Sequence, residues 1–179
     1  MKTVEDNDFE IPESLNNILR EYQKRGFLWL KTLKHNGFGG ILADDMGLGK
    51  TLQVITFLES ERQEEKQGKT LIVSPASLVF NWSSFFEKLA PDLSVKMVVG
   101  KAKERQEMIQ NADAGDILLT SYDLLKRDID SYKDVQFANQ IIDEAQFIKN
   151  HNTQAARAVK EITASFKLAL TGTPVENRL

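Results

Sequence analysis

The sequence predicts an α/β domain in which a parallel sheet is covered by helices on both faces. Short apolar runs, each bounded by turn formers or polar residues, alternate with longer segments of helical spacing. Strands and helices in alternation are typical of parallel sheets, because each helix returns the chain to the starting edge of the sheet. The chain has 179 residues, of which 41% are hydrophobic and 27% charged, and these values suit one folded domain with a sizeable core.

The elements can be placed in order along the chain. Residues 1–10 are polar and acidic and are expected to form a flexible lead-in, with the folded domain over 11–179. Residues 11–37 carry apolar side chains at three- and four-residue spacing, which predicts one or two amphipathic helices ending near Gly37. The predicted strands are 39–43, 70–74, 95–99, 116–120, 139–145 and 166–172. The predicted helices between them are 50–67, 77–89, 102–110, 121–132 and 153–163.

Composition excludes several classes of site. The chain has no cysteine and only His35 and His151 as histidines, so disulfides, thiolate metal sites and histidine-rich zinc sites are excluded. No apolar run is long enough to cross a bilayer, and neither a signal peptide nor a membrane partner is expected. A net charge of -3 argues against a strongly basic surface but leaves room for a local basic groove. The charged run ERQEEK at 61–66 is predicted to be the solvated end of a helix.

The stretch GGILADDMGLGKT at 39–51 has the order strand, glycine-containing loop, helix. This order lets backbone amides and the positive end of the helix dipole face an anion, and Gly47 and Gly49 allow close approach. Lys50 would reach the β- and γ-phosphates of a nucleotide, and Thr51 would place its hydroxyl on magnesium. The predicted phosphate-binding residues are Met46, Gly47, Leu48, Gly49, Lys50 and Thr51. The alternative is a tight turn with a chance Gly-Lys-Thr.

A second candidate is the acidic pair at the end of the apolar run NQIIDEA. Asp143 can hold magnesium, largely through water, and Glu144 can orient and activate the water that attacks the γ-phosphate. Such a pair alone is more often a solvated strand end. After a phosphate loop in an alternating domain, the catalytic interpretation is favoured.

These motifs, together with LREYQKRGFLWL before the loop and LTGTPVEN near the end, resemble a known family. The chain is similar to the first RecA-like lobe of the Swi/Snf-type DNA translocase ATPases of helicase superfamily two. Its motif sequences most resemble those of bacterial members. The resemblance covers nearly the whole chain after residue 11. An acidic residue is usual in this family at the position of Asp44, where the generic phosphate loop begins with glycine.

The resemblance assigns further roles. Gln23 would contact the adenine edge, with Arg20 and Tyr22 as weaker candidates for base or ribose, although Glu21 stands where the family has proline. Four hydroxyls would contact one DNA strand, and helix capping is an equally strong alternative for them: Ser74, Ser77, Thr120 and Ser121. Four residues would couple hydrolysis to movement: Gln146, Thr171, Gly172 and Thr173.

The resemblance implies a DNA-dependent ATPase that uses ATP and magnesium, translocates along double-stranded DNA, and remodels protein–DNA complexes with RNA polymerase or another DNA-bound protein as partner. A second RecA-like lobe, absent from this chain, would supply an arginine finger. Such a finger is worth about 10³ to 10⁵ in turnover, so the isolated chain is expected to be nearly inactive. Two alternatives are an RNA helicase lobe and a non-catalytic, nucleotide-gated binding module. The expected location is the bacterial cytoplasm, in association with the nucleoid, or the nucleus of a eukaryote.

Overall fold

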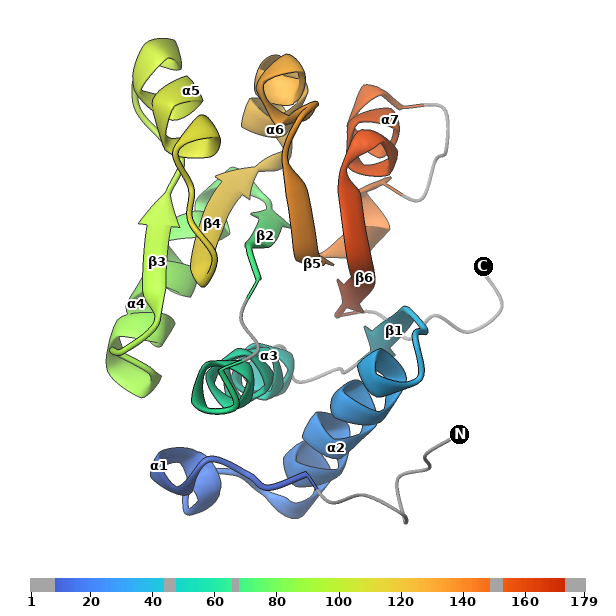
Figure 1. Ribbon diagram of the computed structural model, residues 1–179. Coiled ribbons are helices and arrows are strands. Elements are labelled where there is room, and N and C mark those ends of the chain that lie inside the picture. Colours follow the sequence, from blue (N-terminus) through green and yellow to red (C-terminus); the bar gives the residue numbers. More distant parts are fainter. Residues whose placement is uncertain (1–8, 44–47, 66–67, 149–152, 173–179) are drawn as a thin grey trace.

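Six parallel strands form one sheet in the order β1-β6-β5-β2-β4-β3 (Figure 1). The computed structural model describes residues 9–43, 48–65, 68–148 and 153–172. The strands are β1 (Gly40–Ala43), β2 (Thr70–Ser74), β3 (Ser94–Met97), β4 (Asp116–Ser121), β5 (Gln136–Ile142) and β6 (Thr163–Thr171). The prediction of a parallel sheet is therefore confirmed. Every residue of β2 and β4 is buried, which explains why the centres of these two strands, 71–73 and 117–119, are uninterrupted apolar runs.

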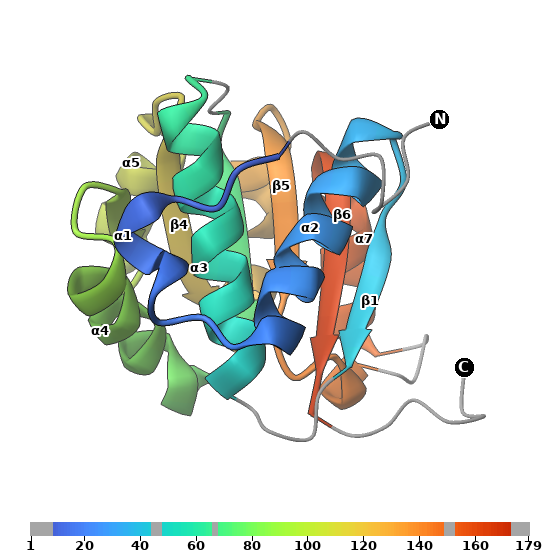
Figure 2. The same ribbon diagram turned by 90° about the horizontal axis from the view of Figure 1, so that it is seen from below.

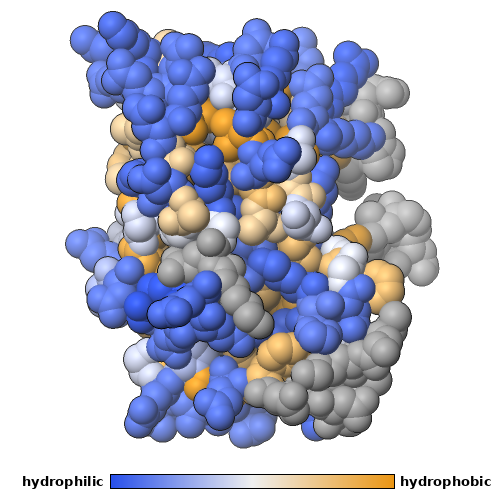
Figure 3. All heavy atoms as spheres, in the orientation of Figure 1, coloured by the Kyte–Doolittle hydropathy of each residue, from blue (hydrophilic) through white to orange (hydrophobic). Residues whose placement is uncertain are grey.

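Helices cover both faces of the sheet, as predicted. On one face lie α1 (Glu13–Asn16), α2 (Glu21–His35), α3 (Leu48–Gln63) and α4 (Val79–Leu89), which stand in front of the strands in Figure 2. On the other face lie α5 (Ala102–Gln110), α6 (Tyr122–Asp128) and α7 (Gln154–Glu161). Each face has its own apolar core, one around Phe27, Phe57 and Phe86 and the other around Leu118 and Leu125. Figure 3 shows the side of the molecule seen in Figure 1, where hydrophilic residues cover much of the surface and apolar residues lie between them.

Several element boundaries differ from the predicted ones for local reasons. The helix predicted over 77–89 begins as a 3₁₀ turn, η1 (Ala76–Leu78), directly after Pro75, and the helix predicted over 121–132 ends as a second turn, η2 (Ile129–Tyr132). The helix predicted over 50–67 ends at Gln63, since Glu65 adopts a left-handed backbone conformation with φ 57°. Gly37, with φ 80°, follows α2 near the predicted position. No helix of the described ranges is long and apolar enough to span a membrane.

A buried polar network fastens α2 and α3 to the sheet at the edge where β2 and β5 begin. Asn139 of β5 donates from Nδ2 to Glu61 Oε1 at 2.9 Å and to Thr70 Oγ1 at 3.0 Å. Lys34 donates to Asn139 Oδ1 at 2.9 Å and pairs with Glu61. The expectation of a solvated run at 61–66 is therefore wrong for Glu61, which is 6% exposed, because a lysine and an amide from other elements satisfy its carboxylate.

Replacing Asn139 tests this network. Asn139→Ala removes three hydrogen bonds and should lower the free energy of unfolding by about 2 to 3 kcal/mol, since buried polar partners lose their acceptor or donor. The measurement is urea denaturation followed by circular dichroism. Lys126→Ala, which removes an exposed pair with Asp123, is the control and should leave the midpoint nearly unchanged. An Asn139→Ala midpoint equal to that of the control would contradict the role given to the network.

Candidate functional site

The carboxyl ends of the parallel strands bring three functional segments to one edge of the sheet. In strand order, β6 lies between β1 and β5, with Ala43 opposite Thr171 and Ile142 opposite Ala169. The helix after β1 carries Lys50, and Asp143 follows β5 directly. Neighbouring parallel strands end at the same edge, so residues far apart in the sequence become neighbours here. This edge is the usual ligand position in open α/β sheets.

The side chains of Lys50 and Glu144 both lie close to Gly172. A β-carbon placed on Gly172 would be 3.4 Å from Lys50 Nζ and 3.7 Å from each carboxylate oxygen of Glu144. Lys50 is only 2% exposed, and a lysine buried to this degree requires nearby acceptors or negative charge. The arrangement therefore combines a buried cation, a carboxylate and a position without a side chain, which suits an anionic group that must approach the backbone closely.

The backbone turns sharply at Glu144. Its φ of 51° places a non-glycine residue in the left-handed region, where local strain of about 1 to 3 kcal/mol is typical of functional sites. The Glu144 amide donates to Asp143 Oδ1 at 2.9 Å, and the Phe147 amide donates to the Glu144 carbonyl at 3.0 Å. These bonds hold the turn that ends β5 at Ile142 and starts η3 (Ala145–Ile148). The strand predicted over 139–145 is observed at Gln136–Ile142, with the same length but three residues earlier, and this turn sets its end.

A chain of side-chain hydrogen bonds links Glu144 to the end of β6. Gln146 donates from Nε2 to Glu144 Oε2, and the Thr171 hydroxyl donates to Gln146 Oε1 at 3.1 Å. The sequence-predicted residues Glu144, Gln146 and Thr171 are thus joined, with Gly172 directly after them. Thr173, the remaining residue of this predicted set, lies outside the described residues.

Asp143 is buried and hydrogen-bonded on both carboxylate oxygens. Trp82 of α4 donates from Nε1 to Asp143 Oδ2 at 2.8 Å, opposite the bond from the Glu144 amide. Burial raises the pKa of the Asp143 carboxyl above its ordinary value, while these hydrogen bonds and the charge of Lys50 act in the opposite direction. A carboxylate has about four lone-pair positions, so both oxygens can still accept from a metal ion or its water ligands.

Few side chains near Asp143 could hold a metal ion. The described part of the chain contains no group of three or more histidine or acidic residues arranged to hold a metal. Magnesium rarely needs such a cage, since it keeps several waters and is bound through one or two carboxylates together with substrate phosphates. The residues present, Asp143 and the hydroxyl of Thr51, fit magnesium of this kind.

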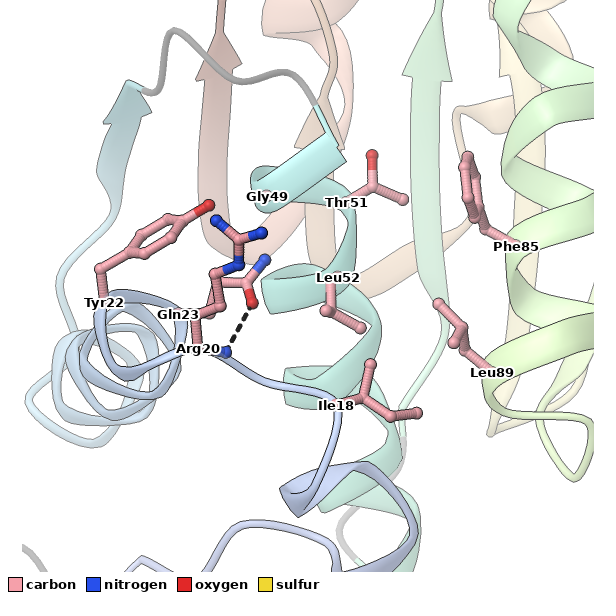
Figure 4. Close-up of a pocket in the computed structure, with 9 residues that line it drawn as sticks. All are labelled: Ile18, Arg20, Tyr22, Gln23, Gly49, Thr51, Leu52, Phe85 and Leu89. Atoms are coloured by element: carbon pink, nitrogen blue, oxygen red, sulfur yellow. Dashed lines mark hydrogen bonds between the residues drawn. The ribbon is translucent and has the colours of Figure 1, made fainter.

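A cavity of about 340 Å³ lies beside the start of α3 (Figure 4). Its walls come from the segment before α2, from the first turn of α2, from α3 and from α4. The lining residues are Ile18, Arg20, Tyr22, Gln23, Gly49, Thr51, Leu52, Phe85 and Leu89. Gln23 Oε1 accepts a hydrogen bond from the Arg20 amide at 2.8 Å, which fixes the side-chain amide. Apolar walls with a fixed amide and a guanidinium match the needs of a flat heterocyclic base.

The cavity also contains Thr51 and Gly49, so it adjoins the first turn of α3. Gln53 Nε2 donates to the Gly49 carbonyl at 3.0 Å, one turn further along the same helix. The structure thus places Arg20, Gln23, Gly49 and Thr51 around one cavity and Lys50 at the neighbouring strand edge. Of the other predicted phosphate-binding residues, Met46, Gly47 and the side chain of Leu48 lie outside what the structure describes.

The four residues whose hydroxyls are predicted to contact DNA differ in their burial and in their hydrogen bonds. Ser77 is exposed on η1, whereas Ser74 is 1% exposed and donates to the Pro75 carbonyl at 3.1 Å. Thr120 is fully buried, and the structure shows no hydrogen-bond partner for its hydroxyl among the described residues. Ser121 caps α6 by accepting from the Leu124 amide at 3.2 Å, which confirms the capping alternative for this residue. Neither Ser74 nor Ser77 caps η1 or α4, so that alternative is wrong for them.

Sequence reasoning missed two residues that hold Asp143. They are Trp82 and Tyr122. The Tyr122 hydroxyl donates to the main-chain carbonyl of Asp143 at 2.6 Å. Both residues are apolar in bulk and stand at ordinary core positions, so only their N–H and O–H groups could have suggested buried partners.

The described residues form a candidate nucleotide site at the carboxyl edge of an open α/β sheet, and comparison with known proteins identifies the family. The sequence model of the SNF2-related domain family matches residues 22–179, so the chain belongs to this family. The chain is 44% identical to a protein of Mycoplasma genitalium described as an uncharacterized ATP-dependent helicase, with 100% of this chain and 18% of that protein covered. It is 39% identical to the ISWI chromatin-remodeling complex ATPase ISW1 of Saccharomyces cerevisiae, with 95% and 15% covered.

A solved structure agrees with this assignment. The Sulfolobus solfataricus SWI2/SNF2 ATPase core, in complex with double-stranded DNA, matches with a TM-score of 0.79 and 40% identity. The match covers 89% of this chain and 33% of that chain. The predicted family and the RecA-like α/β fold are therefore confirmed. The chain spans less than a fifth of the two curated relatives, at 18% and 15% of their lengths.

Filling the space at Gly172 tests the site directly. Gly172→Ala should fold normally, because the nearest atom would be 3.4 Å away, an ordinary contact distance. Its methyl group would lie against Lys50 Nζ and the Glu144 carboxylate, where the terminal phosphate is expected, so affinity for ATP should fall about 10-fold or more, equivalent to about 1.4 kcal/mol. Titration calorimetry measures the affinity, and thermal unfolding serves as the control. Unchanged ATP affinity in a normally folded variant would show that this space is not used.

Proposed function

We propose that this chain is the ATP-binding lobe of a DNA-dependent ATPase that couples ATP hydrolysis to movement along double-stranded DNA. The observation that carries the proposal is the placement of Lys50 and Glu144 around Gly172, with Asp143 buried beside them. A buried cation, a carboxylate and a metal-binding carboxylate are the groups that cleavage of a terminal phosphate requires. They lie at the sheet edge where such ligands bind.

ATP would bind with its base in the cavity and its phosphates at the start of α3. The apolar walls formed by Ile18, Phe85 and Leu89 would stack on the base, and the Nε2 of Gln23 would donate to its edge. Arg20 would lie beside the base or ribose. The phosphates would then extend from Thr51 towards Lys50 and Gly172.

Thr51 and Asp143 would hold magnesium, Asp143 largely through water. Bound there with ATP, the ion would neutralise charge that develops on the phosphates. Glu144 would orient and activate the attacking water, since its carboxylate borders the space where the terminal phosphate would lie. Gln146, which is hydrogen-bonded to both Glu144 and Thr171, would respond together with Thr171 to the presence of that phosphate.

The choice of duplex DNA is supported by the comparisons. The matching structure is an ATPase core in complex with double-stranded DNA, and ISW1 is the ATPase of a chromatin-remodelling complex. In this proposal a second RecA-like lobe of the same protein completes the site, and a DNA-bound protein such as RNA polymerase is displaced or remodelled. The protein would act in the cytoplasm at the nucleoid, or in the nucleus of a eukaryote.

The experiment that tests the proposal is ATP hydrolysis by the full-length protein with no nucleic acid, with double-stranded DNA and with single-stranded RNA. Duplex DNA should stimulate turnover, and Lys50→Ala should abolish it, because the buried cation at the phosphates is lost. Stimulation by RNA alone would identify an RNA helicase instead. No turnover under any condition would identify a nucleotide-gated binding module.

Glu144→Gln separates binding from chemistry. The amide keeps the shape of the side chain but cannot accept a proton, so turnover should fall by about 10² to 10⁴ while ATP still binds. Phosphate release measures turnover, and calorimetry with magnesium and ATP measures binding. Thr163→Ala, a change at the opposite end of β6, is the control. Turnover equal to that of the control would refute the role of Glu144.

A further inference from the structure

Asp143 is held by side chains from both faces of the sheet. Trp82 belongs to α4, on the face shared with α2 and α3, and Tyr122 belongs to α6 on the opposite face (Figures 1 and 2). Trp82 donates to the carboxylate of Asp143 at 2.8 Å, and Tyr122 donates to its main-chain carbonyl at 2.6 Å. The three residues are at most 8% exposed, so water competes little for these bonds.

The two bonds control different parts of the site. Trp82 fixes the orientation of the carboxylate that would face magnesium. Tyr122 fixes the peptide group between Asp143 and Glu144, directly before the left-handed turn at Glu144. Burial raises the pKa of the Tyr122 hydroxyl, so it remains a donor throughout the physiological range.

Both donors belong to helices whose starts carry hydroxyls predicted to contact DNA, and of these four hydroxyls Ser77 alone is exposed. Ser77 lies on η1, which leads directly into α4. Trp82 is the fourth residue of α4. Tyr122 is the first residue of α6, immediately after Thr120 and Ser121. A ligand that shifts the start of either helix therefore moves a group hydrogen-bonded to Asp143.

We propose that Trp82 and Tyr122 are positioning residues for Asp143 and Glu144, and that the stimulation of ATP turnover by duplex DNA depends on their two hydrogen bonds. This inference rests on the proposed function and adds the route by which DNA regulates the site. Neither residue touches ATP in this account. They act by fixing where the Asp143 carboxylate and the Glu144 backbone lie.

The test uses the full-length protein with Trp82→Phe and Tyr122→Phe, which keep an aromatic ring and remove the donor. Two matched controls remove comparable groups that do not contact Asp143. Tyr132→Phe removes a buried hydroxyl without a hydrogen-bond partner among the described residues. Phe86→Leu trims the buried ring that packs against Trp82 at a centroid distance of 6.0 Å.

Three quantities are measured: the ratio of DNA-stimulated to basal turnover, the Kd for duplex DNA, and Mn²⁺ binding in the presence of a non-hydrolysable ATP analogue, followed by electron paramagnetic resonance. Trp82→Phe and Tyr122→Phe should lower the stimulation ratio about 10-fold, the factor expected for loss of one buried hydrogen bond, with little change in the Kd for DNA. Trp82→Phe should also weaken Mn²⁺ binding, and Tyr122→Phe should affect it less. Both controls should behave as the wild type.

The outcomes separate this inference from the proposed function. Wild-type protein without DNA stimulation would refute the proposed function, and the inference with it. Stimulation that persists in both donor variants, or that falls equally in the controls, would refute the inference alone. Tyr122→Phe removes a single oxygen atom, so the test stands on this variant if Trp82→Phe disturbs folding.

Discussion

The alignment of β1, β6 and β5 at one edge of a parallel sheet is the constraint on which the site depends. Hydrogen-bonded registers fix these strands side by side, with Ala43 opposite Thr171 and Ile142 opposite Ala169. The residues that follow the strands therefore meet without long loops to position them. Lys50, Glu144 and Gly172 are brought together in this way, although 122 positions separate the first from the last (172 − 50).

The site is further restrained by bonds that run across the layers. Asp143 connects a tryptophan on one face with a tyrosine on the other, and Glu144 is joined through Gln146 to Thr171. At the opposite edge, Asn139 joins β5 to the charged ends of α2 and α3. The strand β5 is thus anchored at its middle and directly after its end, and the acidic pair follows a firmly held strand. Preorganised groups of this kind are favourable for catalysis, because they need little reorganisation during the reaction.

Much of this could be predicted from the sequence. Each strand was found within a few residues, since apolar runs between turn formers carry a strong local signal. The role predicted for Lys50 rests on the phosphate-loop pattern before a helix, and the roles predicted for Asp143 and Glu144 rest on an acidic pair at the end of an apolar run. The unexpected features depend on pairs that are distant in the sequence: Trp82 is 61 residues from Asp143, and Lys34 is 105 residues from Asn139. Local periodicity marks such residues as core or surface but does not identify their partners, which is why Glu61 was predicted to be solvated.

The account is tested most directly by locating the adenine ring. The full-length protein would be photolabelled with an azido-adenine analogue of ATP, and the labelled peptides would be mapped by mass spectrometry. We expect labels within residues 18–23 or 85–89, which line the cavity beside α3, and we expect excess ATP to prevent labelling. Labels confined to other segments, or labelling that ATP does not reduce, would contradict the placement of the nucleotide and with it the assigned roles of Gln23, Lys50 and Glu144.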